Sequence, residues 1–329
     1  MGPAHGPGPA HLAGPGGPAR PAAPREDPRA PPRRAGRARR RRGIGEVTAP
    51  AVHPTAIVDP AATLGAGVTI GAFSVVGPDV VLGDGVAVGH HVVIEGRVEV
   101  GPRVSIGHFS SIGGLPQDLK FDPATVSGVR IGPDTVLREY VAVHRATRPG
   151  GVTEIGRRCL LMGLTHVAHD CRLGEGVVLV NYAGLSGHCE LDDFVTVGGQ
   201  AGLPPFTRVG TFAYVGGCSK LEADLPPYML ANGNPATVRG INNVGLRRAG
   251  MPAAERRAVK EAYRVLYRSG LAPGAALERL RRHPAPTPAV ERIVTFVAAS
   301  TRRGICPPPR GWRDSAGAGE ADVESERVL

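Results

Sequence analysis

A six-residue periodicity dominates the middle of the chain. Counting from Val58 in steps of six gives ten aliphatic residues in succession, ending at Ile112. The register resumes at Ile131 for three steps and again at Ile155, from which twelve aliphatic residues follow one another to Leu221. A helix favours a period near 3.6 and an ordinary strand a period of 2, so neither explains the pattern. Short flat strands joined by tight corners do, because the aliphatic side chain then points into a shared core and glycines let the chain turn.

Stacked coils of this kind bury a continuous aliphatic column and pair each strand with the strands above and below it. Aromatic residues make up only 4% of the chain, so the core must consist of small and β-branched side chains. The repeat is interrupted at about 114–130 and 146–153. We expect these interruptions to be loops that project from the coils, where functional residues tend to lie.

Beyond residue 224 the repeat stops and the signals become those of helices. Apolar residues at helical spacing between Pro252 and Gly270 predict one helix, with Pro at its start and Gly after its end. Two further helices are expected near 274–282 and 288–302. Together they predict a small C-terminal α-helical domain.

The ends of the chain differ in composition from this core. Residues 1–45 hold ten arginines and two acidic residues, which places +8 of the net charge of +10 there. A segment so rich in Arg, Pro and Gly buries too little apolar surface to order itself, so it is interpreted as a disordered tail and not as a nucleic-acid-binding element. The expected parts are a disordered tail (1–48), a mainly β domain that forms a parallel β-helix with two inserted loops (49–224), an α-helical domain (225–306) and a flexible tail (307–329).

The five cysteines are an odd number and include no C-x-x-C pair. A reduced chain is the default expectation for such cysteine usage. The sequence contains neither the apolar stretch of a secretory signal nor a run of 18 apolar residues that would span a bilayer. We therefore expect a cytoplasmic protein without a membrane span.

Histidines stand out against the aliphatic repeat, and four of them lie in its second half: His144, His166, His169 and His188. A coil of roughly 18 residues places His169 and His188 at nearly the same edge on adjacent coils. Asp170 directly follows His169 and is suited to orient an imidazole. Three interpretations fit these residues: a general base acting on a sugar hydroxyl, a zinc site with an open position, and solvated corner residues without a chemical role.

Several strings of residues, taken in their order, carry a family resemblance. They are His53-Pro54-Thr55-Ala56, Gln117-Asp118-Leu119-Lys120-Phe121, His144-Arg145, the string from Leu160 to Cys171, Gly184-Leu185-Ser186-Gly187-His188, Val215-Gly216-Gly217-Cys218-Ser219 and Leu266-Tyr267-Arg268-Ser269-Gly270. Over about 51–305 the chain resembles the hexapeptide-repeat acyltransferases that use acyl-carrier-protein thioesters to acylate UDP-N-acetylglucosamine. The resemblance implies a left-handed parallel β-helix, a homotrimer, and the first step of lipid A biosynthesis. It implies no cofactor and no metal.

The same resemblance assigns roles to residues. His169 is implied to be the general base that takes the proton of the glucosamine 3-hydroxyl, with Asp170 beside it. Gly187 is implied to offer its backbone N–H to the developing oxyanion. The residues implied to line the substrate cleft, the acyl channel and the nucleotide site are Asp118, Lys120, His144, His166, His188, Gly217, Asn242 and Arg248.

The resemblance fails on the acceptor side. The family usually carries His-Gln at the position of Pro204-Pro205, its glutamate falls on Val244, and its arginine pair becomes Arg248-Ala249. These departures keep open a related acyltransferase that acts on a different nucleotide-linked or amino sugar. From other classes, a zinc-dependent γ-type carbonic anhydrase and a non-catalytic trimeric scaffold remain alternatives.

Overall fold

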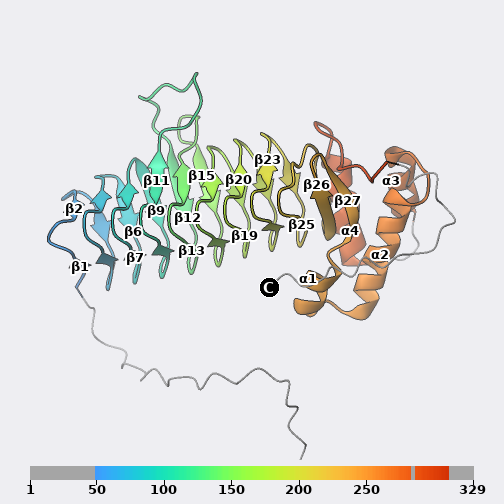
Figure 1. Ribbon diagram of the computed structural model, residues 1–329, viewed down its shortest axis with the longest axis horizontal. Helices are drawn as coiled ribbons and strands as arrows, with labels where there is room; N and C mark the ends of the chain where they lie inside the picture. Colours follow the sequence, from blue (N-terminus) through green and yellow to red (C-terminus); the bar gives the residue numbers. More distant parts are fainter. Residues whose placement is uncertain (1–48, 283–285, 311–329) are drawn as a thin grey trace, which may run out of the picture. The chain divides into compact units, whose positions relative to one another are not determined.

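The coils of the repeat wind into a left-handed parallel β-helix, as the sequence predicted (Figure 1). The structure is a computed structural model that describes residues 49–282 and 286–310. The expected disordered segment 1–48 and most of the expected flexible tail 307–329 lie outside these residues. None of the helices described is both long and apolar enough to cross a membrane.

Three sheets form the faces of the β-helix. Sheet A contains β1 (Ala51–Val52), β4 (Thr69–Ile70), β7 (Ala87–Val88), β10 (Ser105–Ile106), β13 (Val136–Leu137), β16 (Leu160–Leu161), β19 (Val178–Leu179), β22 (Thr196–Val197), β25 (Tyr214–Val215), β26 (Met229–Gly233) and β27 (Ala236–Ile241). Sheet B contains β2 (Ile57–Val58), β5 (Val75–Val76), β8 (Val93–Ile94), β11 (Ser111–Gly114), β14 (Ala142–His144), β17 (His166–Val167), β20 (Gly184–Leu185) and β23 (Gly202–Leu203). Sheet C contains β3 (Thr63–Leu64), β6 (Val80–Leu82), β9 (Arg97–Val100), β12 (Gly128–Ile131), β15 (Val152–Ile155), β18 (Arg172–Leu173), β21 (Glu190–Leu191) and β24 (Arg208–Val209).

The hexad aliphatic residues form the core of these coils. From Ile70 to Leu221 each of them is buried, with at most 5% of its surface exposed. Neighbouring strands pair in register, so that Leu161 lies beside Leu179, 18 residues later. This register is what brings residues i and i+18 together at every corner.

The outward-facing residues differ between the three sheets. From β9 onward those of sheet C alternate in charge: Glu99, Arg130, Glu154, Arg172, Glu190 and Arg208. Arg130 contacts both Glu99, at 3.2 Å, and Glu154, at 2.8 Å. The outward positions of the β-helix strands in sheets A and B carry no Asp, Glu, Lys or Arg. Only sheet C therefore presents a charged face.

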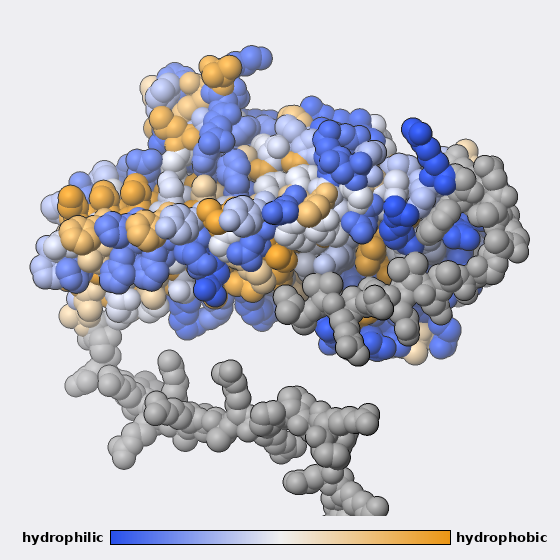
Figure 2. All heavy atoms as spheres, in the orientation of Figure 1, coloured by the Kyte–Doolittle hydropathy of each residue, from blue (hydrophilic) through white to orange (hydrophobic). Residues whose placement is uncertain are grey.

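Two loops project from the coils at the expected places, between β11 and β12 and between β14 and β15 (Figure 1). The second loop packs on the first: the Gly150 N–H donates to the Val126 carbonyl at 2.8 Å, and the Arg145 guanidinium lies 5.6 Å from the Phe121 ring centroid. Figure 2 shows apolar residues among hydrophilic ones on this projection, which includes the fully exposed Leu119.

The residues after the repeat begin with a hairpin that the sequence did not predict. Strands β26 and β27 pair antiparallel and extend sheet A beyond β25. Four helices follow: α1 (Asn243–Arg248), α2 (Ala253–Tyr267), α3 (Pro273–Arg281) and α4 (Pro288–Ala299). The expectation that the last helix reaches residue 302 is wrong. It ends at Ala299 because the chain returns to the β-helix, where the Cys306 N–H donates to the Asp224 carbonyl at 2.7 Å.

Candidate active site

The histidines of interest gather at the corner between sheets B and C. Since the register is 18 residues, His169 stacks on Gly187 and Asp170 stacks on His188. Asp170 and His188 both have left-handed backbone conformations, with φ of 59° and 61°. The rings of His169 and His188 meet edge to face with centroids 5.2 Å apart. The expected clustering of these two imidazoles is present.

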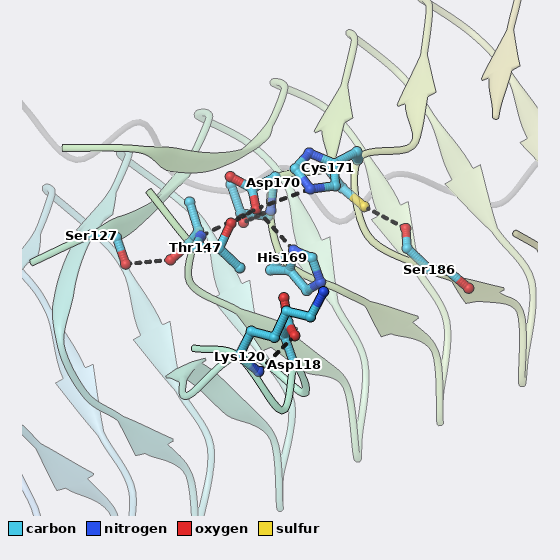
Figure 3. A network of polar contacts seen from close by, with 11 residues as sticks. Asp118, Lys120, Ser127, Thr147, His169, Asp170, Cys171 and Ser186 are labelled. Carbon is cyan, nitrogen blue, oxygen red and sulfur yellow. Dashed lines mark hydrogen bonds and ion pairs between the residues drawn. The ribbon is translucent and has the colours of Figure 1, made fainter. Parts of the chain in front are cut away.

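Asp170 fixes the imidazole of His169 (Figure 3). Nδ1 of His169 lies 2.8 Å from Oδ2 of Asp170, and the same oxygen accepts hydrogen bonds from the Thr147 hydroxyl at 2.7 Å and the Thr147 N–H at 3.1 Å. Burial pushes the pKa of Asp170 upward, but the hydrogen bonds from Thr147 and His169 outweigh it and hold the pKa below its ordinary value. An ionised carboxylate at this position keeps the proton of His169 on Nδ1. Nε2 is then left with the lone pair that a general base needs.

Gly187 lies against the face of this imidazole. A Cβ atom at residue 187 would lie 2.4 Å from Cε1 and 2.6 Å from Nε2 of His169. Glycine is therefore required here by the position of the catalytic ring and not by a turn. The absence of a side chain leaves the backbone N–H of Gly187 within reach of a group that reacts beside His169.

The corners elsewhere in the β-helix explain why this N–H is available. At four corners a side chain 18 residues later accepts the N–H of the middle residue: Asp84 from Ala66 at 2.8 Å, His90 from Ala72 at 2.8 Å, His108 from His90 at 2.8 Å and Asp193 from Glu175 at 2.7 Å. The residue 18 after Gly187 is Pro205, whose side chain has no acceptor. Among the residues described, none accepts a hydrogen bond from the Gly187 N–H.

His144 and His166 form a second pair of imidazoles, on sheet B. Their ring centroids are 5.0 Å apart. Burial, together with His166 and His169, lowers the pKa of His144 to about 4, and burial followed by His169 also lowers the pKa of His166. Nδ1 of His144 and Nε2 of His166 are buried without a hydrogen-bond partner among the described residues. Buried polar atoms of this kind usually have partners, so both nitrogens are suited to receive a ligand.

His188 is held between two side chains. Its ring stacks on Phe206 with centroids 4.5 Å apart, and its Nε2 lies 3.6 Å from Oδ2 of Asp170. Burial lowers the pKa of His188, although Asp170 acts in the opposite direction. The ring is thus directed by an aromatic platform on one side and by the catalytic carboxylate on the other.

The remaining candidate residues lie apart from this cluster. Asp118 and Lys120 are exposed on the first loop, where the Asp118 carboxylate accepts the Lys120 N–H at 2.9 Å (Figure 3). A Cβ atom at Gly217 would meet nothing closer than the Gly199 carbonyl oxygen at 3.3 Å, so the protomer itself does not strictly require glycine there. The roles implied for these three residues stay predictions.

Asn242 and Arg248 lie at the two ends of α1. The Asn242 side chain accepts the Gly245 N–H at 3.0 Å and donates to the Phe212 carbonyl at 2.9 Å, so both of its ends serve the fold. Arg248 is exposed. Their contact with a nucleotide stays a prediction, and the hydrogen bonds of Asn242 give that residue a structural role as a helix cap.

Sequence reasoning missed Thr147 and Phe206. Phe206 was within reach, because it lies 18 residues after His188 and therefore stacks on it. Thr147 lies in a loop without a repeat, so no register indicated that it would contact Asp170.

One group among the described residues has the donor set of a metal site. Ligand atoms of His169, Asp170 and His188 lie within 4.8 Å of one another. The Nδ1 atom of His169 and the Oδ2 atom of Asp170 are already joined by a hydrogen bond. A metal ion would have to replace that bond, so this arrangement fits an oriented general base better than a ligand set.

Comparison with known proteins places this geometry in a family. Residues 224–306 match the family model described as UDP N-acetylglucosamine O-acyltransferase, domain 2, and residues 61–96 match the bacterial transferase hexapeptide model. The acyl-(acyl-carrier-protein)–UDP-N-acetylglucosamine O-acyltransferase of Synechocystis is 43% identical over 200 residues, which cover 60% of this chain and 72% of the relative. The enzyme of the same name from Rippkaea orientalis is 52% identical over the same shares.

Solved structures agree over almost their whole length. The UDP-N-acetylglucosamine acyltransferase of Francisella novicida superposes with a TM-score of 0.78 at 33% identity and covers 82% of this chain and 99% of its own. The structure titled LpxA from Acinetobacter baumannii has a TM-score of 0.74 at 35% identity, covering 78% and 99%. The chain belongs to the UDP-N-acetylglucosamine O-acyltransferase family.

Proposed function

We propose that the protein transfers an acyl group from an acyl-carrier-protein thioester to the 3-hydroxyl of UDP-N-acetylglucosamine, the first step of lipid A biosynthesis. The observation that carries this proposal is the juxtaposition at the corner between sheets B and C. An imidazole oriented by Asp170 lies against Gly187, whose N–H has no acceptor among the described residues. A base and an oxyanion donor beside each other are what acyl transfer to an alcohol requires.

The proposed reaction follows from these two groups. Nε2 of His169 takes the proton of the sugar hydroxyl while the hydroxyl oxygen attacks the thioester carbonyl carbon. The carbonyl oxygen becomes an oxyanion and accepts a hydrogen bond from the Gly187 N–H. As the tetrahedral intermediate collapses, the carbon–sulfur bond breaks and the His169 imidazolium returns the proton to the departing thiolate. The Asp170 carboxylate stabilises the imidazolium between these steps.

We further propose that the active form is a homotrimer. An aromatic stripe runs along the corner between sheets A and B, where Phe73, His91, Phe109 and Tyr140 stack with successive centroid separations of 5.0, 4.9 and 5.0 Å. Phe73 is 57% exposed, Phe109 48% and Tyr140 49%. Exposed apolar surface of this extent marks an interface.

The faces on either side of the stripe favour a second copy as its partner. Sheets A and B present no charged residue from their β-helix strands, whereas sheet C carries the alternating charges. Three copies related by a closed rotation place the stripe at the axis and sheet A of one copy against sheet B of the next. His144 and His166 lie on sheet B, so their unpartnered nitrogens would face the cleft between copies. A soluble carrier protein and nucleotide sugar as substrates place the enzyme in the cytoplasm.

Product analysis tests the proposed function. The purified protein is incubated with acyl-carrier thioesters of several chain lengths and with UDP-N-acetylglucosamine or other nucleotide-linked amino sugars. Mass spectrometry should detect an O-acylated UDP-N-acetylglucosamine that is absent when His169→Gln replaces the parent. Acylation of another amino sugar alone would replace the acceptor in this proposal. No acylated product from any pair would overturn it.

A further inference from the structure

A groove opens over sheet C, on the far side of the catalytic corner from sheet B. Its volume is about 680 Å³. Asp170, His188 and Phe206 of the corner line one part, and outward residues of sheet C line another. Two arginines from outside the coils complete the lining: Arg148 from the loop between β14 and β15, and Arg302 from the segment after α4.

Most charges in this groove are already paired. Arg172 lies 3.2 Å from Glu154, and Arg208 lies 3.5 Å from Glu190. The two other carboxylates also have donors: Asp170 accepts from Thr147 and His169, and Asp224 accepts the Arg208 N–H at 3.0 Å.

Arg148 and Arg302 differ from these residues. Both are exposed, and neither forms an ion pair with another described residue. Both guanidinium groups also contribute to lowering the pKa of His188, after its burial, which indicates that they lie close to that ring. The groove therefore holds two uncompensated positive charges beside the catalytic cluster.

The position of Arg302 is fixed by the corner itself. Its guanidinium carbon lies 3.4 Å from the centroid of the Phe206 ring, and Phe206 stacks on His188 with an interplanar angle of 5°. The neighbouring Arg303 anchors the backbone, because its guanidinium donates to the Pro205 carbonyl at 3.0 and 2.6 Å and to the Glu222 carbonyl at 3.0 Å. A guanidinium held flat on a ring keeps its N–H edges free for an oxyanion.

We propose that Arg148 and Arg302 form a phosphate-binding subsite in this groove, beside His188. This inference rests on the proposed function, which supplies two phosphorylated substrates. The nucleotide sugar carries a diphosphate, and the carrier protein presents its thioester on a phosphopantetheine arm. Two guanidinium groups match the geometry and charge of a phosphate group from either source.

Calorimetry tests the subsite without requiring turnover. The parent, Arg148→Gln and Arg302→Gln are titrated with UDP, uridine, 4′-phosphopantetheine and pantetheine. Either substitution should weaken binding of one phosphorylated probe by about tenfold, the loss of roughly one charged contact, and leave its dephosphorylated counterpart unaffected. Weakened UDP assigns the subsite to the acceptor, and weakened 4′-phosphopantetheine assigns it to the donor.

Arg172→Gln is the matched control, because it removes one charge from the same groove but from a residue paired with Glu154. It should bind all four probes like the parent. An equal loss in this control would reduce the effect to general electrostatics and overturn the subsite, as would parent-like binding by both test variants.

Steady-state kinetics separate this inference from the proposed function. If the parent transfers acyl groups, the test variants should raise KM for one substrate about tenfold and leave kcat within about twofold. Unchanged KM values for both substrates would sink the subsite and leave the function standing. A parent without transferase activity would sink the function, while a probe loss confined to Arg148→Gln and Arg302→Gln would still support the subsite.

Discussion

Gly187 lies so close to His169 that a single added methyl group would meet the imidazole, with 2.4 Å between its carbon and Cε1. The contact arises because the two residues are 18 apart and therefore stack on successive coils. It sets the base and the oxyanion donor side by side on a rigid scaffold. Catalysis depends on holding such groups in a fixed geometry.

Gly187→Ala should reduce kcat/KM by about 10²-fold or more, because the added Cβ displaces the His169 ring. The backbone at residue 187 is not in the left-handed region, so the fold should tolerate alanine. Thermal unfolding followed by circular dichroism should show little change in Tm. Gly240→Ala is the control, since a Cβ there meets nothing within 4 Å. Parent-like activity of Gly187→Ala would show that the close contact has no catalytic consequence.

Pro205→Asp should supply the missing cap at the catalytic corner. A carboxylate at this position would accept the Gly187 N–H as Asp84 accepts that of Ala66. Loss of one oxyanion donor lowers kcat by about 10²-fold, with KM little changed. Pro205→Ala adds no acceptor and should keep most of the activity. Equal kcat values for the two variants in steady-state assays would contradict the role assigned to this N–H.

Stability should fall in mildly acidic solution because of the buried imidazoles. The pKa of His144 is about 4 in the folded protein and near its ordinary value of 6.5 when unfolded. The unfolded chain therefore binds more protons between these values, so the free energy of unfolding decreases as the pH falls from about 6.5 to 4. Urea denaturation at several pH values measures this slope. His144→Gln should flatten it, and parallel curves for parent and variant would refute the assignment.

Charge in the aromatic stripe should break the trimer. Tyr140→Arg is expected to shift the mass measured by light scattering from about three times 34.1 kDa to that of a single chain, with loss of acyl transfer. Val81→Arg is the control, because Val81 is 43% exposed but belongs to sheet C. A trimeric Tyr140→Arg protein, or a monomeric parent, would contradict the proposed assembly.

The repeat explains which parts of the structure were readable from the sequence. A strict step of six determines the core and the contact between residues i and i+18, so the β-helix and the clustering of His169 with His188 could be predicted. Contacts from segments without the repeat could not. Thr147 reaches Asp170 from a loop, and Arg302 reaches Phe206 from the segment after α4, neither of which has a register.

The same register changes the interpretation of one apparent loss. Pro205 was read as a missing acceptor residue by resemblance. In the structure it lies 18 residues after Gly187, where side chains at other corners cap the corresponding N–H. Its meaning depends on hydrogen bonds between coils, which no single string of residues reveals.

The most direct test of the account is the turnover number of His169→Gln with saturating acyl-carrier thioester and UDP-N-acetylglucosamine. Glutamine keeps a polar side chain of similar reach but is not a base near neutral pH. The account predicts that kcat falls by about 10²- to 10⁴-fold while calorimetric affinity for UDP-N-acetylglucosamine is preserved. A His169→Gln protein with kcat close to that of the parent would contradict it.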